Sequence, residues 1–420
     1  MANLQNAMSG LQLAASHMQS NKYLMSISNG FTAALPVFII GAFSTLLANL
    51  PIDSYLAFIK AHGLQQAIAL PASVTLKIMS IYVCFFIAYK LAGSLGHNEM
   101  VVSSIAIMCF LITSPVTIVD GAEVMPFKYL GAGGLFVAIM VALLVNKIYS
   151  FVVDRQLTIR MGDNVPPVVA ETFNGLIPAI INVIIFATIA ALFKLTSAGS
   201  LHAYIYFIIQ QPLLGITGSY SGMITFVVVA HVLWLFGIHG PMVTGTIWKP
   251  LYLAMDLENL TAFQNGDPLP HIVGYAFWGI WASLGGSGST LGLNLLMAFK
   301  AKSEGLKKLG RMALPTSFLC INEPIIFGIP IVLNPMLAIP FVLAPALNVT
   351  VAYFLIATDV LPRMIGVFNV IGMPVFANAF IQGSWLFALL QVFLIVLNTL
   401  IYYPFFKRLD NTMRTQATQA

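Results

Sequence analysis

The chain has 420 residues, of which 59% are hydrophobic and only 8% are charged, whereas a soluble domain is about half apolar and about a quarter charged. This composition excludes a water-soluble globular protein. The net charge of +5 comes from a few basic clusters beside apolar stretches, so it indicates membrane topology and gives no evidence of nucleic-acid binding. Only helices and closed barrels satisfy their backbone hydrogen bonds inside lipid, and long unbroken apolar stretches favour helices.

The N-terminal segment, Met1 to Lys22, is polar and lacks the basic start and short apolar core of a cleaved signal peptide. We therefore expect that no leader is removed. Its apolar residues recur at helical spacing, which leaves two interpretations open. The segment either lies along the membrane surface as an amphipathic helix or forms a cytosolic tail.

Long apolar stretches follow, each close to the roughly 20 residues that a membrane-spanning helix needs. Together with interrupted segments nearer the C-terminus, they predict an all-α polytopic membrane protein with about ten transmembrane helices. The unbroken stretches are Phe31 to Leu50, Val74 to Ala92, Val101 to Val119, Leu135 to Val153, Gly175 to Leu195, Met223 to Ile238 and Trp385 to Phe406.

Basic residues flank these stretches in clusters, and positive charge is typical of cytoplasmic loops. We expect all of these clusters in the cytoplasm, and both chain termini with them. The clusters are Lys147, Arg155 and Arg160; Lys300, Lys302, Lys307, Lys308 and Arg311; and Lys407, Arg408 and Arg414.

The sequence divides into two parts of different character, residues 1–195 and residues 196–420. The first consists of clean apolar stretches with short polar turns, which is typical of a transmembrane scaffold. In the second, glycines, prolines and polar residues interrupt the apolar runs. Non-helical backbone at membrane depth is tolerated only where protein or a water-filled cavity satisfies it, so we expect the transport site there. The interruptions are Gly237 to Pro241, Gly285 to Thr290, Asn322 to Gly328 and Arg363 to Pro374.

A linker, Met161 to Pro167, follows the first basic cluster. Its paired prolines suit the start of a helix and not its interior. The stretch after it, Val168 to Phe173, is predicted to be an interfacial amphipathic helix.

The most informative motif is Asn322-Glu323-Pro324, which places a carboxylate within an apolar run. A carboxylate at the centre of a membrane helix costs roughly 2.5–3.5 kcal/mol, so Glu323 should face a polar cavity and have a partner. Asn322 offers hydrogen-bond donors and acceptors beside it, and Pro324 frees backbone groups of the preceding turn. One interpretation gives Glu323 a functional role, and the alternative is that it only ties two helices together.

A second motif, Trp234 to Pro241, ends an apolar stretch in a histidine flanked by glycines. His239 is either a satisfied helix-end histidine or a group that exchanges hydrogen bonds with a sugar hydroxyl. Trp234 lies about one turn away and offers a flat apolar face, so with Glu323 the pair predicts a carbohydrate site. His231, on the same stretch, is a weaker candidate.

A third motif, Gly285-Gly286-Ser287-Gly288-Ser289-Thr290, lies between two apolar runs and predicts the tip of a hairpin within the membrane. Small residues let the backbone turn and present its N–H and C=O groups to a ligand, which makes Gly286, Ser287 and Ser289 candidate substrate contacts. No lysine follows, so this is not a nucleotide-binding loop.

The remaining polar residues predict less chemistry. Lys249, Asp256 and Glu258, together with Asn265 to Pro268, are interpreted as a solvated connection in preference to a binding site, and Arg363 either reaches the membrane surface or forms a second re-entrant tip. No cofactor and no metal are expected. The cysteines, which are scattered singly and interpreted as buried thiols, are Cys84, Cys109 and Cys320.

Across nearly its whole length the chain resembles the EIIC components of the bacterial phosphotransferase system, in the cellobiose, diacetylchitobiose and lactose family. The resemblance implies a homodimer formed by the N-terminal part, and a C-terminal part with two re-entrant hairpins that binds the sugar and moves as a rigid body. It also implies that Glu323 lies near the sugar 6-hydroxyl, with His239 as its partner and Trp234 against a sugar ring. The matching residues are Val165 to Pro167 leading to Phe173 and Pro178, Gly237 to Gly240, Gly285 to Leu293 and, above all, Asn322 to Gly328.

In this family a phosphocysteine of a cytosolic EIIB protein, supplied through EIIA, phosphorylates the sugar. None of the three cysteines here opens the loop rich in glycine, serine and threonine that such a residue needs, so the phosphate is expected from a separate EIIB. Glu323 and His239 either assist proton removal or only position the sugar.

The sequence therefore predicts a sugar permease of the bacterial cytoplasmic membrane, a subunit of a phosphotransferase complex without a phosphocysteine of its own. Its substrate would be a β-linked disaccharide or a β-glucoside. The alternative is an ion-coupled secondary sugar carrier. An intramembrane enzyme is disfavoured, because metal-ligand and paired-acid spacings are not apparent.

Overall fold

The computed structural model describes residues 20–50, 52–159, 173–329, 331, 334–368 and 372–419. The predicted N-terminal amphipathic segment, up to residue 19, lies outside these residues, as do the paired-proline linker and nearly all of the interfacial helix after it. The chain forms two compact units, Met18–Gly215 and Ile216–Ala420. The sequence had placed the division after Leu195, because the apolar runs beyond it are interrupted by glycines, prolines and polar residues.

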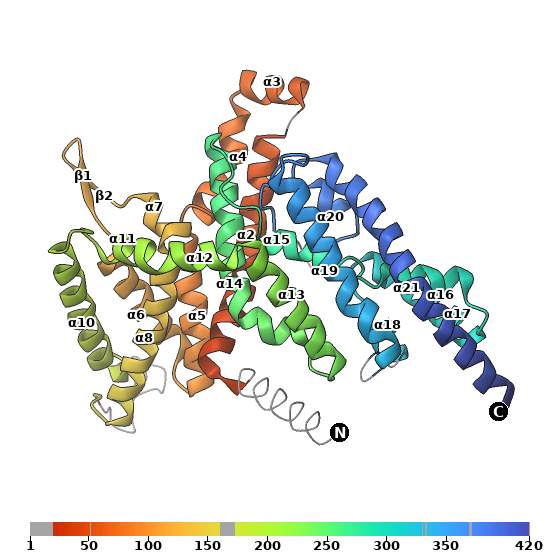
Figure 1. The fold of residues 1–420 in the computed structure, drawn as a ribbon. Helices are drawn as coiled ribbons and strands as arrows, with labels where there is room; N and C mark the ends of the chain where they lie inside the picture. The colour runs from red at the N-terminus through yellow and green to blue at the C-terminus, as the bar shows by residue number, and fades with distance from the viewer. Residues whose placement is uncertain are drawn as a thin grey trace. The chain divides into compact units, whose positions relative to one another are not determined.

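The first unit is helical (Figure 1). Helices α4 and α5 pack on α2, and α5 also packs on α6 and α8. Side chains of Asn21 and Asn98 accept hydrogen bonds from the first free N–H groups of α2 and α6 and so cap these helices. The helices are α2 (Lys22–Ala48), α3 (Asp53–Ala61), α4 (Leu64–Thr75), α5 (Met79–Leu95), α6 (Glu99–Thr113), α7 (Phe127–Leu130), α8 (Leu135–Asp154), α10 (Leu176–Lys194), α11 (Leu201–Ile205) and α12 (Gln211–Thr217).

A short β-hairpin departs from the predicted all-helical fold. Strands β1 (Thr117–Val119) and β2 (Ala122–Val124) pair antiparallel through exposed residues. Asp120 and Gly121 both have positive φ, 49° and 79°, as the turn of a two-residue hairpin requires. The predicted span from Val101 to Val119 is therefore wrong at its C-terminal end, because α6 ends at Thr113, just before Pro115, and Thr117–Val119 is strand β1.

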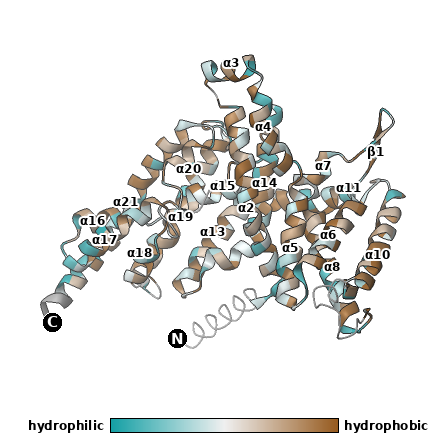
Figure 2. Ribbon diagram, turned by 180° about the vertical axis from the view of Figure 1, so that it is seen from behind, coloured by the Kyte–Doolittle hydropathy of each residue, from teal (hydrophilic) through white to brown (hydrophobic). Residues whose placement is uncertain are grey.

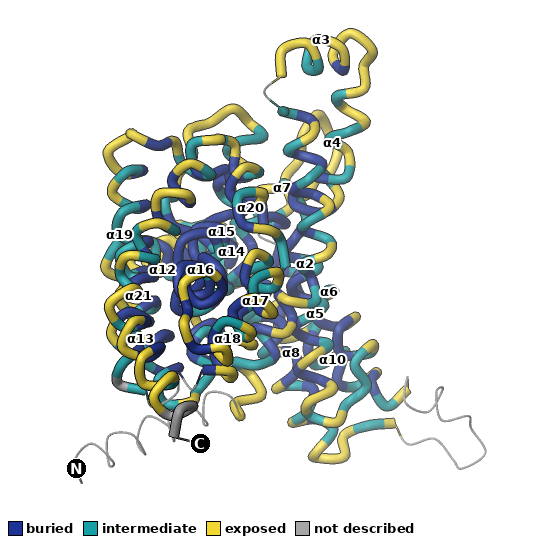
Figure 3. The backbone as a smooth tube through the Cα atoms, turned by 90° about the vertical axis from the view of Figure 1, so that its right-hand side faces the viewer, coloured by how far each residue is buried: buried dark blue, intermediate teal, exposed yellow. Residues whose placement is uncertain are grey.

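The second unit is also helical, and its buried residues are concentrated at and around α14, α15 and α16 (Figure 3). Helix α13 packs on α14 and α19, and α21 packs on α16 and α19. The elements are α13 (Tyr220–Leu235), α14 (Gly240–Asn265), α15 (Tyr275–Phe277), a π-helical turn (Trp278–Ala282), α16 (Leu291–Lys300), α17 (Glu304–Phe318), α18 (Glu323–Gly328), α19 (Pro335–Ala357), α20 (Ala377–Phe380) and α21 (Trp385–Gln419).

Among the described residues, six helices are long and apolar enough to cross a membrane, and a seventh span is possible if the bent pair around residues 218–219 counts as one. The sequence predicted about ten spanning elements. One of the six, Met336–Ala357, was not among the predicted unbroken stretches because Pro340 and Pro345 lie inside it. Figure 2 shows hydrophobic colour along α10 and hydrophilic colour around α17 and the end of α21.

Helix α16 packs on α17 and on α21, so α16 and α17 form a helical hairpin whose tip is the basic connection around Lys302. The glycine-rich motif lies before this hairpin, between the π-helical turn and α16. The carboxylate of Asp410, on α21, accepts hydrogen bonds from the backbone N–H groups of Lys302 (2.9 and 3.1 Å) and Ser303 (2.8 Å). This one side chain therefore joins the hairpin tip to the last helix.

The chain from Leu361 to Phe368, which includes the start of the last interrupted segment, is neither helix nor strand and is largely buried. Gln382 satisfies part of its backbone by donating to Val367 O (2.6 Å) and accepting from Gly366 N (3.2 Å). Arg363 donates to the carbonyls of Leu269 and Pro270 at 2.6 and 2.8 Å. The arginine thus holds a neighbouring loop, a role that neither sequence interpretation included.

Replacing Asp410 with alanine should lower the free energy of unfolding by roughly 2 kcal/mol, because buried backbone donors lose a charged acceptor. Thermal unfolding of the purified protein in detergent, followed by circular dichroism, measures the change. Asn411→Ala, at the exposed neighbouring position, is the matched control and should leave the midpoint unchanged. Equal midpoints for the two variants would show that Asp410 does not secure the tip.

Candidate functional site

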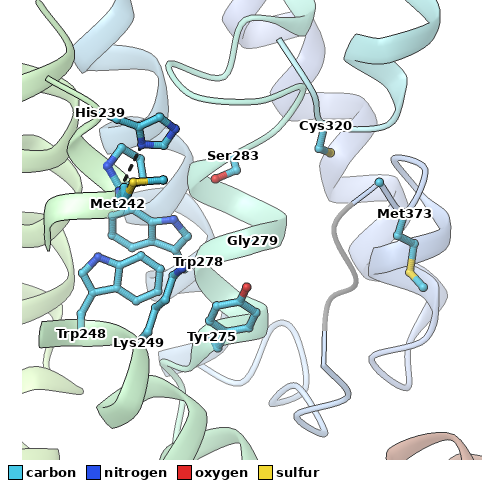
Figure 4. Close-up of a pocket in the computed structure, with 12 residues that line it drawn as sticks. His239, Met242, Trp248, Lys249, Tyr275, Trp278, Gly279, Ser283, Cys320 and Met373 are labelled. Carbon is cyan, nitrogen blue, oxygen red and sulfur yellow. Dashed lines mark hydrogen bonds between the residues drawn. The ribbon is translucent and has the colours of Figure 1, made fainter. Parts of the chain in front are cut away.

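The second unit contains a pocket of about 350 Å³, at the lower end of the roughly 300–1,000 Å³ typical of small-molecule sites. Its walls come from the start of α14, the α15 segment, and the residues before α18 and α20 (Figure 4). The lining residues are His239, Pro241, Met242, Trp248, Lys249, Tyr275, Trp278, Gly279, Ser283, Cys320, Gly372 and Met373.

Aromatic side chains form one wall of this pocket. The rings of Trp248 and Trp278 are stacked, with centroids 4.2 Å apart and planes inclined by 22°, and the ring of Tyr275 lies 6.1 Å from that of Trp248. The Trp248 indole is fixed because its Nε1 donates to Thr244 Oγ1 (3.1 Å). Flat aromatic faces with polar edges suit a ligand that has both apolar and polar surfaces, as a sugar ring does.

A buried carboxylate positions the α15 segment, residues 275–283, against α14. Asp256 is 3% exposed and accepts a hydrogen bond from Ala276 N at 2.7 Å, which satisfies a free donor at the start of α15. Glu258 pairs with His271 at 2.6 Å, and Lys249 lines the pocket. The prediction that Lys249, Asp256 and Glu258 belong to a solvated connection is therefore wrong. All three lie in helix α14, where Lys249 lines the pocket, Asp256 binds the start of α15 and Glu258 pairs with His271.

His239 caps α14 and faces the pocket. Its Nδ1 accepts a hydrogen bond from Met242 N at 3.2 Å, so the neutral ring carries its proton on Nε2 and can donate from there. Its ring centroid lies 4.5 Å from that of Trp234. The structure therefore brings together His239 and Trp234, two of the predicted site residues. Trp234 is 5% exposed and belongs to a buried apolar cluster that includes Ile325 and Ile326.

Several groups act electrostatically on His239, which lies between helices and outside the segments of spanning length. Burial lowers its pKa below the ordinary value. A backbone hydrogen bond and the Glu323 carboxylate raise the pKa, and Lys249 lowers it further. The net shift is downward, so the imidazole is neutral at neutral pH.

The glycine-rich turn and the Asn322 motif meet. Asn322 Nδ2 donates to Ser287 O and to Thr290 Oγ1, both at 2.6 Å. Gly286 has φ of 96°, and a Cβ atom there would collide with the Asn322 side chain. Gly286, Ser287 and Asn322 are therefore in one place, and glycine is needed both for its backbone conformation and for the close approach.

Two other predicted residues have different surroundings. Ser289 is buried, and its hydroxyl donates to Ala282 O (3.3 Å) and accepts from Asn348 Nδ2 (3.1 Å), so these bonds stabilise the turn from inside. Glu323 begins α18 and is exposed, whereas the sequence predicted a carboxylate facing a polar cavity. Glu323 is exposed because it is the first residue of a short helix and does not lie inside a membrane-spanning one.

Sequence reasoning missed most of the pocket wall. Trp248, Tyr275, Trp278 and Ser283 were not among the predicted site residues, and Cys320 was interpreted as a buried thiol, although it lines the pocket and is partly exposed. One signal was present. All five tryptophans of the chain, Trp234, Trp248, Trp278, Trp281 and Trp385, fall in the second unit.

Together the fold and the pocket define a multi-pass helical membrane protein that has a pocket lined by polar and aromatic side chains. The family model "Phosphotransferase system, EIIC" matches residues 28–345. The chain therefore belongs to the EIIC family of the phosphotransferase system.

Individual relatives agree over almost the whole chain. The lichenan permease IIC component of Bacillus subtilis (strain 168) is 34% identical over 412 residues, covering 94% of this chain and 91% of that protein. The cellobiose-specific EIIC component of Geobacillus stearothermophilus is 32% identical over 414 residues, with 94% and 92% covered. The crystal structure of the transporter ChbC, the IIC component of the N,N'-diacetylchitobiose-specific system, matches with a TM-score of 0.92 at 31% identity, covering 97% of this chain and 98% of that one.

Replacing Gly286 with alanine should destabilise the protein and weaken ligand binding, because the new Cβ requires both an unfavourable φ, about 1 kcal/mol or more, and displacement of Asn322. Gly266→Ala is the control, since Gly266 also has positive φ, 73°, but has open space around it. Thermal midpoints in detergent should fall further for Gly286→Ala than for Gly266→Ala. An equal fall would mean that Asn322 does not pack closely against the turn.

Proposed function

We propose that this chain is the sugar permease of a phosphoenolpyruvate-dependent phosphotransferase system, and that it translocates a β-linked disaccharide or β-glucoside. The observation that carries the proposal is the pocket with a stacked tryptophan pair on one side and His239 on the other. Relatives named for lichenan, cellobiose and diacetylchitobiose support this class of sugar.

The hydrogen bonding of His239 supports different roles for the two predicted catalytic residues. Since Nδ1 already accepts from Met242 N, the neutral ring donates from Nε2 to the oxygen of the sugar 6-hydroxyl. The proton of that hydroxyl then needs another acceptor. In this proposal Glu323, the carboxylate of the Asn322-Glu323-Pro324 motif, is the base and His239 the donor that orients the oxygen.

The chemical step follows from these roles. The sugar oxygen attacks the phosphorus of the EIIB phosphocysteine, the O–P bond forms as the S–P bond breaks, the thiolate leaves, and the hydroxyl proton passes to Glu323. Trp234 would contact the sugar ring, while Gly286, Ser287, Ser289 and Asn322 hold the turn beside it. The phosphorylated product carries charge that opposes its return across the membrane.

The rest of the proposal, which concerns the architecture and the topology, is based on membership of the EIIC family and on the basic clusters. The N-terminal part forms the homodimer interface, and the C-terminal part, with two re-entrant segments among about ten spanning elements, carries the sugar by an elevator-type movement. The basic residues of α17 and of the end of α21 face the cytoplasm with both termini. EIIB, which receives its phosphoryl group from EIIA, approaches from that side.

Glu323→Gln should lower phosphoenolpyruvate-dependent accumulation of sugar phosphate by about 10²–10⁴-fold, because it removes the base, and His239→Ala should lower it as well. Membrane vesicles that carry the protein are supplied with labelled cellobiose or diacetylchitobiose and the cytosolic phosphotransferase proteins. Glu304→Gln, an exposed acid on α17, should retain full activity. Full activity of Glu323→Gln would refute the site, and gradient-driven uptake of unmodified sugar would make the protein a secondary carrier.

The orientation is testable by cysteine labelling in a cysteine-free background. Met312 on α17 is 78% exposed, and Val360, after α19, is 63% exposed. Met312→Cys should react with an impermeant maleimide only in inside-out vesicles, because it lies beside the basic cluster. Val360→Cys should react only in right-side-out vesicles, because it lies at the end of α19 remote from that cluster. The reverse pattern would overturn the proposed topology.

A further inference from the structure

Helices α16 and α21 pack against each other and run in the same direction. Gly292 of α16 lies so close to the backbone of Thr399 on α21 that a Cβ atom on the glycine would collide with it. Beyond the end of α16, the backbone N–H of Ser303 donates to Asp410 of α21. These two pairs are equally spaced along the chain, so residues at the same spacing between them lie at about the same depth.

Three lysines from three elements share one depth near the tip of the α16–α17 hairpin. Lys300 of α16 is level with Lys407 of α21 by the spacing of the two pairs. Helix α17 returns in the opposite direction, and its Gly310 lies against the backbone of Ala298. Lys308, slightly nearer the tip than Gly310, is therefore also level with Lys300.

Exposed basic side chains surround the tip at and next to this depth, where Figure 2 shows hydrophilic colour around α17 and the end of α21. Within the described residues, none of them forms an ion pair. The acid Asp410 is buried and binds the backbone of the tip, so Glu304 is the exposed acid on these three helices. The basic side chains, named here the basic band, are Lys300, Lys302, Lys308, Arg311, Lys407 and Arg408.

The exposed surface becomes apolar on the side of the basic band away from the tip. On α21, Tyr403 is exposed one turn before Lys407, and Leu400 and Val396 are exposed further back, by 65% and 55%. On α17, Phe318 is exposed at a corresponding distance from the tip. Cations, then an amphipathic tyrosine, then aliphatic side chains follow the order of the headgroup and hydrocarbon layers of a membrane.

We infer that the basic band is a binding surface for anionic phospholipids of the cytoplasmic leaflet. Ammonium and guanidinium groups bind the lipid phosphates, and the apolar side chains of α17 and α21 contact the acyl chains. An acidic protein would match the cations alone. A phospholipid also matches the apolar surface directly beyond them, and the cytoplasmic leaflet carries the negative charge. This surface is separate from the pocket and takes no part in sugar binding.

Native mass spectrometry of the purified full chain in detergent measures the affinity for single lipids. Phosphatidylglycerol and phosphatidylcholine with identical acyl chains are the two probes, and the unmodified chain should bind the first at least about tenfold more tightly. The triple variant Lys308→Gln, Arg311→Gln and Lys407→Gln should bind phosphatidylglycerol roughly 10²-fold more weakly, since each cation near an anionic surface contributes about fivefold. Its affinity for phosphatidylcholine should change less than about twofold.

A matched control removes three exposed lysines elsewhere, as Lys60→Gln, Lys128→Gln and Lys194→Gln, and should retain the affinity for phosphatidylglycerol. An equal loss in both triple variants would show that only net charge matters and would refute the basic band as a site. An excess of glycerol phosphate, which lacks acyl chains, should not displace the lipid, and displacement would make this a site for free phosphate.

The rival occupant is an acidic cytosolic protein, and transport activity distinguishes it from a lipid. If the basic-band variant binds phosphatidylglycerol as the unmodified chain does, the inference is refuted. A simultaneous loss of phosphoenolpyruvate-dependent accumulation in membrane vesicles would then assign the surface to such a protein. Failure of sugar accumulation in the unmodified chain would contradict the proposed function and leave the lipid affinities as an independent result.

Discussion

A membrane protein has to satisfy every backbone N–H and C=O group without water, and this constraint shapes the second unit. Its helices are interrupted repeatedly, and side chains from other elements bind the released groups. Asn322 binds the glycine-rich turn, Gln382 binds the extended segment, Asp256 caps α15, and Asp410 holds the tip between α16 and α17. The conformation of each non-helical segment is therefore specified by the sequence, because a particular side chain accepts or donates the hydrogen bonds of its backbone.

The pocket is a product of these interruptions. A continuous helix presents only side chains, whereas a helix that begins or ends inside the protein also presents its cap and its turn. His239 is such a cap, Cys320 precedes such a start, and Ser283 follows the π-helical turn. Polar groups from distant parts of the sequence consequently converge beside an aromatic wall, in a region whose composition is otherwise apolar.

The sequence predicted what depends on local pattern and missed what depends on packing. Long apolar runs located α2, α5, α8, α10 and α21, and the cost of a charge in lipid identified the Glu323 motif. Helix α19 was not predicted because Pro340 and Pro345 lie inside it. A proline removes a backbone hydrogen bond from a helix, but neighbouring groups can satisfy the free carbonyl. The burial of Asp256 and the position of Lys249 could not be predicted, because both depend on the α15 segment meeting α14 in space.

The distribution of tryptophan has a consequence for spectroscopy. Because all five indoles belong to the second unit, the intrinsic fluorescence of the protein originates there and the first unit makes no tryptophan contribution. Two of these indoles lie nearly parallel with centroids 4.2 Å apart, a separation at which their electronic transitions couple. The near-ultraviolet dichroism of this coupled pair is thus an optical probe of the pocket wall, while Trp234, Trp281 and Trp385 also contribute to the emission.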